Sequence, residues 1–223
     1  MFERTISLLG EETFKKIQSK TVLIVGIGGV GGFATEALIR SGIENIILID
    51  HDKIDITNLN RQIISSSKNI DKYKVDEFKK RILEINPKCN VEILKIFLDN
   101  TNSNILDNYK IDYIVDACDS IEAKKLLIDY SIKKNIKLIS SMGTANKLDP
   151  SKLTITDIRK TSYDPLSKIL RKYINDIKTN KKIMVVSSTE APIKNKKLST
   201  LIFVPATAGL LCANYIMQDI IKQ

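Results

Sequence analysis

Short apolar runs alternate with segments of helical spacing along the first part of the chain. Thr21–Val25 is a mostly apolar run that ends at a glycine, and this predicts a strand buried on both faces. The apolar residues of Phe33–Arg40 recur at the spacing of a helix, and Asn45–Asp50 is a second short apolar run. The order of strand, helix and strand is typical of one nucleotide-binding half of a parallel α/β sheet.

The same plan repeats as far as residue 140, and the pattern then changes. The first half is expected to continue with helices at 71–86 and 121–134 and with strands at 90–96, 111–115 and 136–140. The second half is expected to contain strands at 153–158, 183–186 and 201–204 and helices at 166–177 and 206–221. We therefore predict an α/β fold, a Rossmann-like nucleotide-binding domain whose mixed sheet is extended by antiparallel strands in the C-terminal half.

A single domain accommodates all of these elements, because 223 residues suffice for one sizeable core. We divide it into an N-terminal helical arm (1–20), a nucleotide-binding half (21–140) and a half that faces the substrate or a second subunit (141–223). The most apolar run, 198–217, approaches the length of a membrane span, but Pro205 and Asn214 interrupt it. We interpret it as a core or dimer segment and expect no membrane insertion.

The chain is basic, with 35 Lys and Arg against 26 Asp and Glu and a formal net charge of +9. This favours approach to polyanions such as nucleic acid, although a lysine-rich composition gives the same excess without such a partner. Basic residues gather at 79–81, 133–134, 181–182 and 194–197. The three cysteines form no paired motif, so neither a zinc site nor a disulfide framework is indicated. Together with a start that does not resemble a signal peptide, this predicts a cytoplasmic protein.

The glycine-rich turn GIGGVGG at 26–32 connects the first strand to the first helix of the sheet. Without side chains at Gly26, Gly28 and Gly31, a nucleotide phosphate can approach the backbone and the positive end of the helix. Asp50 follows Gly31 by nineteen residues and ends the second strand, where it can bind ribose hydroxyls. A tight turn without a ligand carries part of the same pattern, but the complete order favours a nucleotide. NAD, FAD and ATP all fit at this point.

The polar segment after the second strand lies where ligands bind in an open parallel sheet. Asn58, Arg61 and Gln62 can hydrogen-bond a sugar or phosphates from there. His51, the single histidine, is assigned no role, since no second histidine or cysteine joins it. Lys74 lies in the first turn of the next helix, where a cation opposes the helix dipole. Its side chain is therefore either solvated, which the residues alone favour, or compensated by a bound phosphate.

Two acidic residues, Asp116 and Asp119, follow the strand at 111–115 and directly precede a helix. Carboxylates at this place can hold Mg²⁺ beside triphosphate oxygens. Acidic residues that only cap the following helix would give the same sequence pattern. Cys118 lies between them and is expected to be a core residue and not a nucleophile.

Jointly, four segments resemble the family of ubiquitin-activating-like adenylating enzymes, which includes the bacterial activators of sulfur-carrier proteins. They are GIGGVGG, LIDHDKIDITNLNRQI, the helix that holds Lys74, and VDACDS, and the resemblance spans nearly the full chain. Two further segments, SMGTANKLDPSKLTITDIRKTSYDPLSKILRKY and SSTEAP, resemble the subgroup that acts on transfer RNA, the threonylcarbamoyladenosine dehydratases. The resemblance implies ATP-dependent cyclisation of that modified adenosine at position 37 of the RNA, through adenylation of its threonyl carboxylate.

The resemblance also implies roles for individual residues. The nucleotide-binding residues would be Gly26, Gly28, Gly29, Gly31, Asp50, Asp52, Asn58, Arg61, Gln62, Lys74 and Arg4. Catalysis would depend on Arg61, Lys74 and Asp119, and Asp119 would be the ligand of Mg²⁺. Arg4 resembles an arginine that dimers of the family lend across the subunit interface, which implies a homodimer.

Several alternatives stay open. The nearest is an adenylyltransferase that activates the C-terminus of a ubiquitin-like sulfur-carrier protein. Such enzymes often carry paired CxxC motifs and an acceptor cysteine, whereas this chain has neither paired motif and has serines in SSTEAP. A sulfur-relay partner of the cysteine desulfurase type also stays open. An NAD-dependent oxidoreductase would not need Asn58, Arg61, Lys74 and Asp119 together. A non-catalytic module would bind ATP without turnover.

Overall fold

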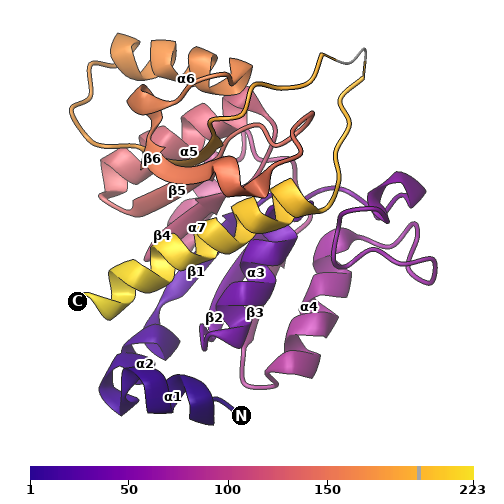
Figure 1. Ribbon diagram of the computed structural model, residues 1–223. Coiled ribbons are helices and arrows are strands. Elements are labelled where there is room, and N and C mark those ends of the chain that lie inside the picture. Colours follow the sequence, from indigo (N-terminus) through magenta and orange to yellow (C-terminus); the bar gives the residue numbers. More distant parts are fainter. Residues whose placement is uncertain (195–196) are drawn as a thin grey trace.

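A seven-stranded sheet forms the centre of the protein in the computed structural model, which describes residues 1–194 and 197–223 (Figure 1). The strands are β1 (Thr21–Val25), β2 (Asn45–Ile49), β3 (Asn90–Leu94), β4 (Tyr113–Asp116), β5 (Lys137–Ser141), β6 (Leu153–Asp157) and β7 (Met184–Ser188). Their order across the sheet is β3-β2-β1-β4-β5-β7-β6, and every neighbouring pair is parallel except β7 and β6. The predicted mixed α/β sheet is confirmed, with the antiparallel pairing confined to β6.

Helices cover both faces of the sheet. They are α1 (Glu3–Leu9), α2 (Glu11–Ser19), α3 (Gly31–Arg40), α4 (Lys74–Ile85), α5 (Ile121–Lys134), α6 (Pro165–Asp176) and α7 (Phe203–Ile221). On one face, Ile17, Leu38 and Ile216 of α2, α3 and α7 belong to a single buried cluster. On the other face, Leu127 of α5 and Leu170 of α6 belong to a second cluster. Burying both faces explains why the parallel strands read as nearly continuous apolar runs.

The helix α7 lies across the face of the sheet that it shares with α3 (Figure 1). Gly209 permits the close approach of the two helices, because a Cβ there would lie 2.3 Å from the backbone oxygen of Val30. Within the described residues, no helix is long and apolar enough to cross a membrane.

The strand predicted at 201–204 is wrong, because Phe203 and Val204 form the first turn of α7. Leu201 is 52% exposed, and the position beside β7 in the sheet is already taken by β6. Pro205 is tolerated in the first helical turn, where backbone N–H groups have no acceptor within the helix.

The other predicted elements agree with the structure to within about three residues, with one correction at α4. The helix predicted to start at Asp71 begins at Lys74 instead, since Asp71 has a φ of 66° and lies in the preceding turn. Part of the basic cluster predicted at 194–197, residues 195 and 196, lies outside the described residues.

The strands β1 and β4 lie side by side where the order of the sheet reverses. The chain places β2 and β3 on one side of β1 and β4 on the other. Val25 and Asp116, the last residues of β1 and β4, are paired in register. Ligands of open α/β sheets bind beyond the carboxyl ends of the strands at such a point.

Candidate active site

A cavity of about 300 Å³ opens where β1, β2 and β4 end. This is at the lower end of the range of about 300–1,000 Å³ that is usual for small-molecule sites. Most of the residues selected from the sequence line it: Gly26, Gly28, Gly29, Asp50, Asp52, Asn58, Arg61, Gln62, Lys74 and Asp119. The fold therefore brings loops from three separate parts of the chain to one place.

The turn after β1 lacks side chains for two different reasons. Gly26 has a φ of 87°, and a Cβ there would lie 2.7 Å from the backbone oxygen of Ala117. A Cβ at Gly31 would lie 1.8 Å from the oxygen of Gly26, so Gly31 lets the turn close onto α3. A Cβ at Gly28 would instead meet only Nε2 of Gln62, at 3.7 Å, and Gly28 lines the cavity, whereas Gly31 does not line it. Gly31 is thus a packing residue of the turn.

The buried carboxylate of Asp50 joins this turn to the loop after β2. Its Oδ2 accepts a hydrogen bond from the backbone N–H of Ile27 at 2.6 Å, and its Oδ1 accepts one from that of Asp52 at 2.8 Å. Each carboxylate oxygen has a second lone pair, so these bonds leave capacity for a ribose hydroxyl.

Lys74 is buried, which corrects the expectation of a solvated side chain. Its side chain is 6% exposed, and its Nζ lies 2.7 Å from Oδ2 of Asp52. The backbone N–H of Lys74 also donates to the carbonyl oxygen of Asp52 at 3.0 Å. This ion pair offsets the unfavourable position of a cation at the start of α4. Because both residues line the cavity, a bound phosphate can share the ammonium with Asp52.

Arg61 brings a positive charge to the cavity. Its Nη1 donates to the backbone oxygen of Thr57 at 2.8 Å and to Oδ1 of Asn60 at 3.0 Å, and both acceptors are neutral. No salt bridge involves Arg61 among the residues that the structure describes. A guanidinium with unused donors is well suited to the oxygens of a polyphosphate.

Two buried amide side chains next to Arg61 have unused hydrogen-bonding capacity. Gln62 has a buried Oε1 without a partner. Asn58 accepts a bond from the backbone N–H of Asp55 through Oδ1, at 3.1 Å, and its Nδ2 donates to no described group. Leaving a buried polar group without a partner costs about 1–3 kcal/mol. The unpaired Oε1 of Gln62 therefore indicates that a polar ligand completes the site.

Asp116 and Asp119 have different surroundings, which excludes a metal site shared by the two. Asp116 is fully buried and paired with Lys124, whereas Asp119 is exposed and lines the cavity. Neither caps the following helix, because Oγ of Ser120 accepts the bond from the N–H of Ala123. Within the described chain Asp119 forms no salt bridge, so its carboxylate can act as a ligand.

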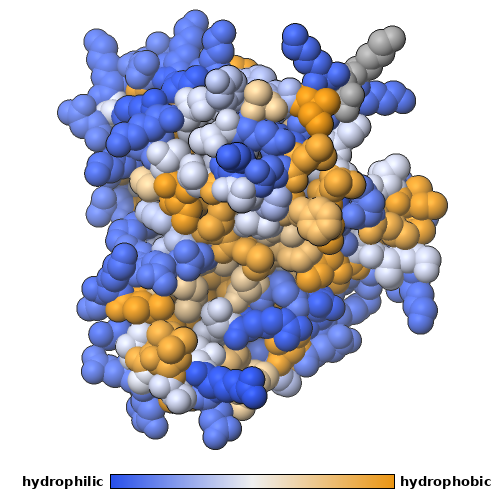
Figure 2. Space-filling model, in the orientation of Figure 1, coloured by the Kyte–Doolittle hydropathy of each residue, from blue (hydrophilic) through white to orange (hydrophobic). Residues whose placement is uncertain are grey.

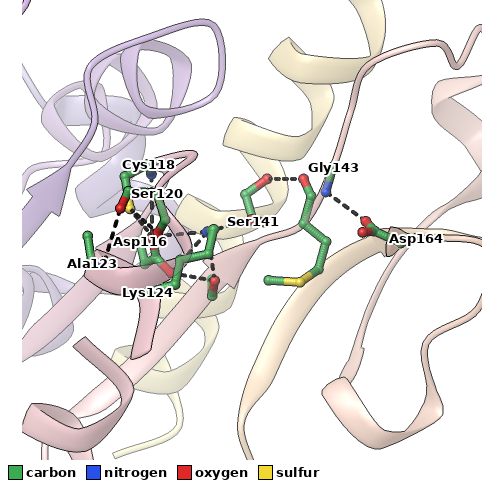
Figure 3. A network of polar contacts seen from close by, with 10 residues as sticks. Asp116, Cys118, Ser120, Ala123, Lys124, Ser141, Gly143 and Asp164 are labelled. Atoms are coloured by element: carbon green, nitrogen blue, oxygen red, sulfur yellow. Dashed lines mark hydrogen bonds and ion pairs between the residues drawn. The ribbon is translucent and has the colours of Figure 1, made fainter. Parts of the chain in front are cut away.

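A buried network lies beneath the segment that carries Asp119 (Figure 3). The ammonium of Lys124 donates to both oxygens of Asp116 at 3.0 Å, to Oγ of Ser140 at 3.1 Å and to the backbone oxygen of Ser141 at 2.8 Å. The ends of β4 and β5 are thereby fixed to the start of α5.

Cys118 also belongs to this network. Its Sγ donates to Oδ1 of Asp116 at 3.1 Å. Burial, followed by the charge of Asp116, raises the pKa of the Cys118 thiol well above its usual range. A thiol with a raised pKa is a poor nucleophile near pH 7, in agreement with the expectation from the sequence. The expectation of a core residue is met only in part, because Cys118 is half-buried and lines the cavity.

Several residues line the cavity that were given no role from the sequence, among them His51, Phe97, Thr144 and Thr200. The ring of His51 packs edge-to-face on Phe97, with ring centroids 5.1 Å apart. Thr144 follows β5, and Thr200 precedes α7. A large apolar residue directly after the predicted strand 90–96 was a usable signal for Phe97, which is 45% exposed in the structure. The two threonines could only be placed by knowing the order of the strands.

A second group of potential metal ligands adjoins the cavity. Carboxylate and imidazole atoms of Asp50, His51 and Asp52 lie within 4.8 Å of one another. Asp52 is already paired with Lys74, and both oxygens of Asp50 accept backbone bonds. We assign no metal to this group.

Arg4 is exposed on α1 and does not line the cavity of its own chain. Helices α1 and α2 pack together at the lower end of the molecule in Figure 1. In its own subunit Arg4 therefore does not contribute to the lining of the cavity.

The chain is similar to known proteins over nearly its whole length. The ThiF family model matches residues 2–222. The tRNA threonylcarbamoyladenosine dehydratase of Bacillus subtilis is 38% identical, covering 99% of this chain and 94% of the relative. The enzyme of the same description from Escherichia coli is 36% identical, over 93% of this chain and 80% of the relative. The crystal structure of the E. coli dehydratase TcdA in complex with ATP superposes with a TM-score of 0.93 at 33% identity, covering 99% of this chain and 93% of that one. The chain therefore belongs to the ThiF family.

Proposed function

We propose that this protein is an ATP-dependent dehydratase that cyclises N6-threonylcarbamoyladenosine in transfer RNA. The observation that carries the proposal is a nearly full-length match to dehydratases of that description, one of them crystallised with ATP. The cavity supports it, because a glycine turn, an unpaired guanidinium and a carboxylate surround the space that a triphosphate would occupy.

In this proposal the cavity holds ATP through complementary charge and hydrogen bonds. The N–H groups of the glycine turn and the start of α3 face the phosphates. Arg61 and Lys74 supply positive charge, and the spare donor of Asn58 and the amide of Gln62 complete the polar contacts. Asp50 accepts hydrogen bonds from the ribose through its remaining lone pairs.

The reaction proceeds in two steps. An oxygen of the threonyl carboxylate attacks the α-phosphorus of ATP, so that an acyl-adenylate forms and pyrophosphate leaves. The carbamoyl nitrogen, or its oxygen, then attacks the acyl carbon and AMP leaves with the former carboxylate oxygen. The nucleoside thereby loses the elements of one water molecule, and ATP becomes AMP and pyrophosphate.

The protein needs no covalent intermediate in this scheme. The attacking group and the acyl carbon belong to the same nucleoside, so proximity supplies much of the acceleration. The neutral thiol of Cys118, which donates to Asp116, is not an acceptor for the acyl group. Arg61 and Lys74 act by neutralising the negative charge that develops on the phosphates.

We further propose that Asp119 holds Mg²⁺ beside the triphosphate. Mg²⁺ is commonly bound by one or two carboxylates together with substrate phosphates, and the single free carboxylate of Asp119 at the cavity fits that donor set. When bound, the ion would neutralise phosphate charge and favour the departure of pyrophosphate.

We also propose a homodimer in which Arg4 reaches the cavity of the neighbouring subunit. Support comes from the exposed apolar side chains that Figure 2 shows over α7. Phe203 and Leu210 are 60% and 49% exposed there, and a contiguous apolar patch of this kind is typical of a surface that a partner covers. The proposed reaction transfers no sulfur, so a cysteine desulfurase-type partner would be an accessory and not a reactant. We also propose a cytoplasmic location, where a transfer RNA substrate is available.

The test is an incubation with ATP, Mg²⁺ and transfer RNA that carries the linear modification. The proposal expects the modified nucleoside to lose the mass of one water, with one AMP formed per nucleoside. Unchanged RNA, together with pyrophosphate exchange that depends on a carrier-protein tail, would instead support the sulfur-carrier adenylyltransferase.

A matched pair of variants tests the metal assignment. Asp119→Asn is expected to lower kcat about a hundredfold or more, because a bound ion is worth several kcal/mol in the transition state. Glu122→Gln removes one charge from an exposed residue of α5 that does not line the cavity, and should keep full activity. Equal activity of the two variants would refute the role of Asp119.

A further inference from the structure

The segment from Ser141 to Tyr173 contributes little to the cavity, although it carries the resemblance to enzymes acting on RNA. Thr144 is its one residue in the cavity lining. The remainder forms β6, two short 3₁₀ turns and α6, which lies at the top of the molecule in Figure 1. Binding of ATP therefore does not explain the residues of this segment.

The start of α6 is fastened to the rim of the cavity through Asp164. Oδ2 of this buried carboxylate accepts a hydrogen bond from the N–H of Gly143 at 2.7 Å (Figure 3). Its Oδ1 accepts one from the N–H of Ser167 at 3.0 Å. Gly143 directly precedes Thr144, which lines the cavity. Through Asp164, the first turn of α6 is therefore tied to the segment that carries Thr144 at the cavity.

Positive charge is concentrated on this part of the chain. Residues 158–182 contain eight Lys and Arg against two Asp, a net charge of +6 out of +9 for the whole protein. Figure 2 shows hydrophilic side chains gathered over the upper part of the molecule, where α6 lies. Such a local excess is the electrostatic footprint of a polyanion-binding surface.

The lysines of α6 point away from the core. Ser167, Leu170 and Ile174 form its buried side, whereas Lys168 and Lys172 are exposed. Lys168 and Lys172 are one helical turn apart and therefore neighbours on the surface. Within the described residues, neither forms a salt bridge, so their charges are available to a partner.

A basic residue and an aromatic residue extend this surface toward the cavity rim. Nη1 of Arg171 donates to the backbone oxygen of Thr161 at 2.9 Å, which holds the stretch from Lys160 to Tyr163 beside α6. The side chain of Tyr163 is 63% exposed and its φ is 53°, a left-handed conformation that is costly for an aromatic residue. An exposed aromatic ring beside lysines is the usual means of stacking an unpaired base.

We propose that the α6 face, made of Lys160, Tyr163, Lys168, Arg171 and Lys172, binds the RNA substrate next to the modified nucleoside. The inference depends on the proposed function for the identity of the RNA. The basic side chains contact phosphates of the anticodon loop, and the ring of Tyr163 stacks on an unpaired base that flanks the nucleoside in the cavity. The bond from Asp164 to Gly143 fixes this face relative to the cavity rim.

Charge reversal on α6 tests the phosphate contacts. Lys168→Glu/Lys172→Glu is compared with Lys15→Glu/Lys88→Glu, which changes the net charge equally at two exposed lysines on α2 and on the turn before β3. Binding of transfer RNA is measured over a salt series, without ATP. Each phosphate contact changes the slope of log Kd against log salt by about 0.7–0.9, which corresponds to about five- to eightfold in Kd at 0.1 M salt. The α6 variant should lose up to two such contacts, and the control none.

Replacement of Tyr163 tests the stacking. Tyr163→Gly removes the ring and suits a positive φ, so this variant should fold, whereas Tyr163→Phe retains a stacking surface. We expect Tyr163→Gly to weaken RNA binding about fivefold or more and Tyr163→Phe to bind like the parent. ATP affinity should be unchanged in all of these variants, because none of the residues lines the cavity.

The outcomes separate this inference from the proposed function. If the α6 variant binds transfer RNA as tightly as the control variant does, the inference is overturned. The basic surface would then be a site for an acidic protein partner. The same holds if the parent protein does not bind transfer RNA. Weakened binding in the α6 variant supports the inference. If the parent then binds transfer RNA through this face but removes no water from it, the proposed function fails while the RNA surface stands.

Discussion

The buried pair of Lys124 and Asp116 allows a quantitative prediction for Lys124→Met. Both side chains are fully buried, and the ammonium of Lys124 makes all four of its contacts inside the protein. The substitution retains an unbranched apolar stem but leaves the carboxylate of Asp116 without its cation. An unpaired buried carboxylate of this kind takes up a proton on folding.

The magnitude follows from the cost of holding that proton. An aspartic acid in an unfolded chain releases its proton near pH 3.9, and each pH unit above this costs about 1.4 kcal/mol. At pH 7 the penalty reaches about 4 kcal/mol, within the range of about 3–5 kcal/mol for breaking a buried ion pair. At pH 5 the same arithmetic gives about 1.5 kcal/mol. The variant binds more protons folded than unfolded in this range, so its stability relative to the parent rises as the pH falls.

Urea unfolding of the parent and of Lys124→Met, at pH 7 and at pH 5, measures both numbers. Asp116→Asn/Lys124→Met serves as the control, because it removes both charges and its cost should not change between the two pH values. A loss below about 1 kcal/mol at pH 7 for the single variant, or a loss that is the same at both pH values, would refute the assignment of a buried ion pair.

Three further predictions concern the turn, the cavity and the parent protein at high pH. Gly31→Ala should prevent folding or destabilise the protein by more than about 3 kcal/mol, because the new Cβ would lie 1.8 Å from the backbone oxygen of Gly26. Thermal unfolding measures this loss, and a Tm equal to that of the parent would contradict the prediction. Arg61→Gln should raise the KM for ATP about tenfold or more by removing charge-assisted bonds, as steady-state kinetics can check, and an unchanged KM would exclude contact with the phosphates. Burial lowers the pKa of Lys124, but the charge of Asp116 raises it by more, so the net pKa lies above the usual 10.5. Its stabilising contribution should therefore be complete at pH 9 and be lost only as the pH rises through that elevated pKa, as unfolding at pH 9 and pH 11 would show.

The sequence predicted the part of the fold and site that depends on local order. Apolar runs placed the strands, and the glycine turn followed by Asp50 marked the cavity at the end of β1. These features are readable because each is set by a few neighbouring residues. Asp119 was found in the same way, since it follows directly after β4.

The remainder depends on contacts between distant residues. The sequence did not indicate that the ammonium of Lys124 is buried against Asp116, because the two residues form a pair only when α5 packs on β4 and β5. Lys74 was expected in solvent for the same reason, as its partner Asp52 comes from another loop. The strand predicted at 201–204 failed because β6 had already taken the edge position beside β7. Local apolarity could not reveal that competition.

The most direct test of the central claim follows the oxygen of the substrate carboxylate. Transfer RNA whose threonyl carboxylate is labelled with ¹⁸O is incubated with the protein, ATP and Mg²⁺, and the nucleotide products are examined by mass spectrometry. Attack on the α-phosphorus predicts one ¹⁸O atom in AMP and none in pyrophosphate. Label in inorganic phosphate with formation of ADP, or label retained in full by the RNA, would contradict the account.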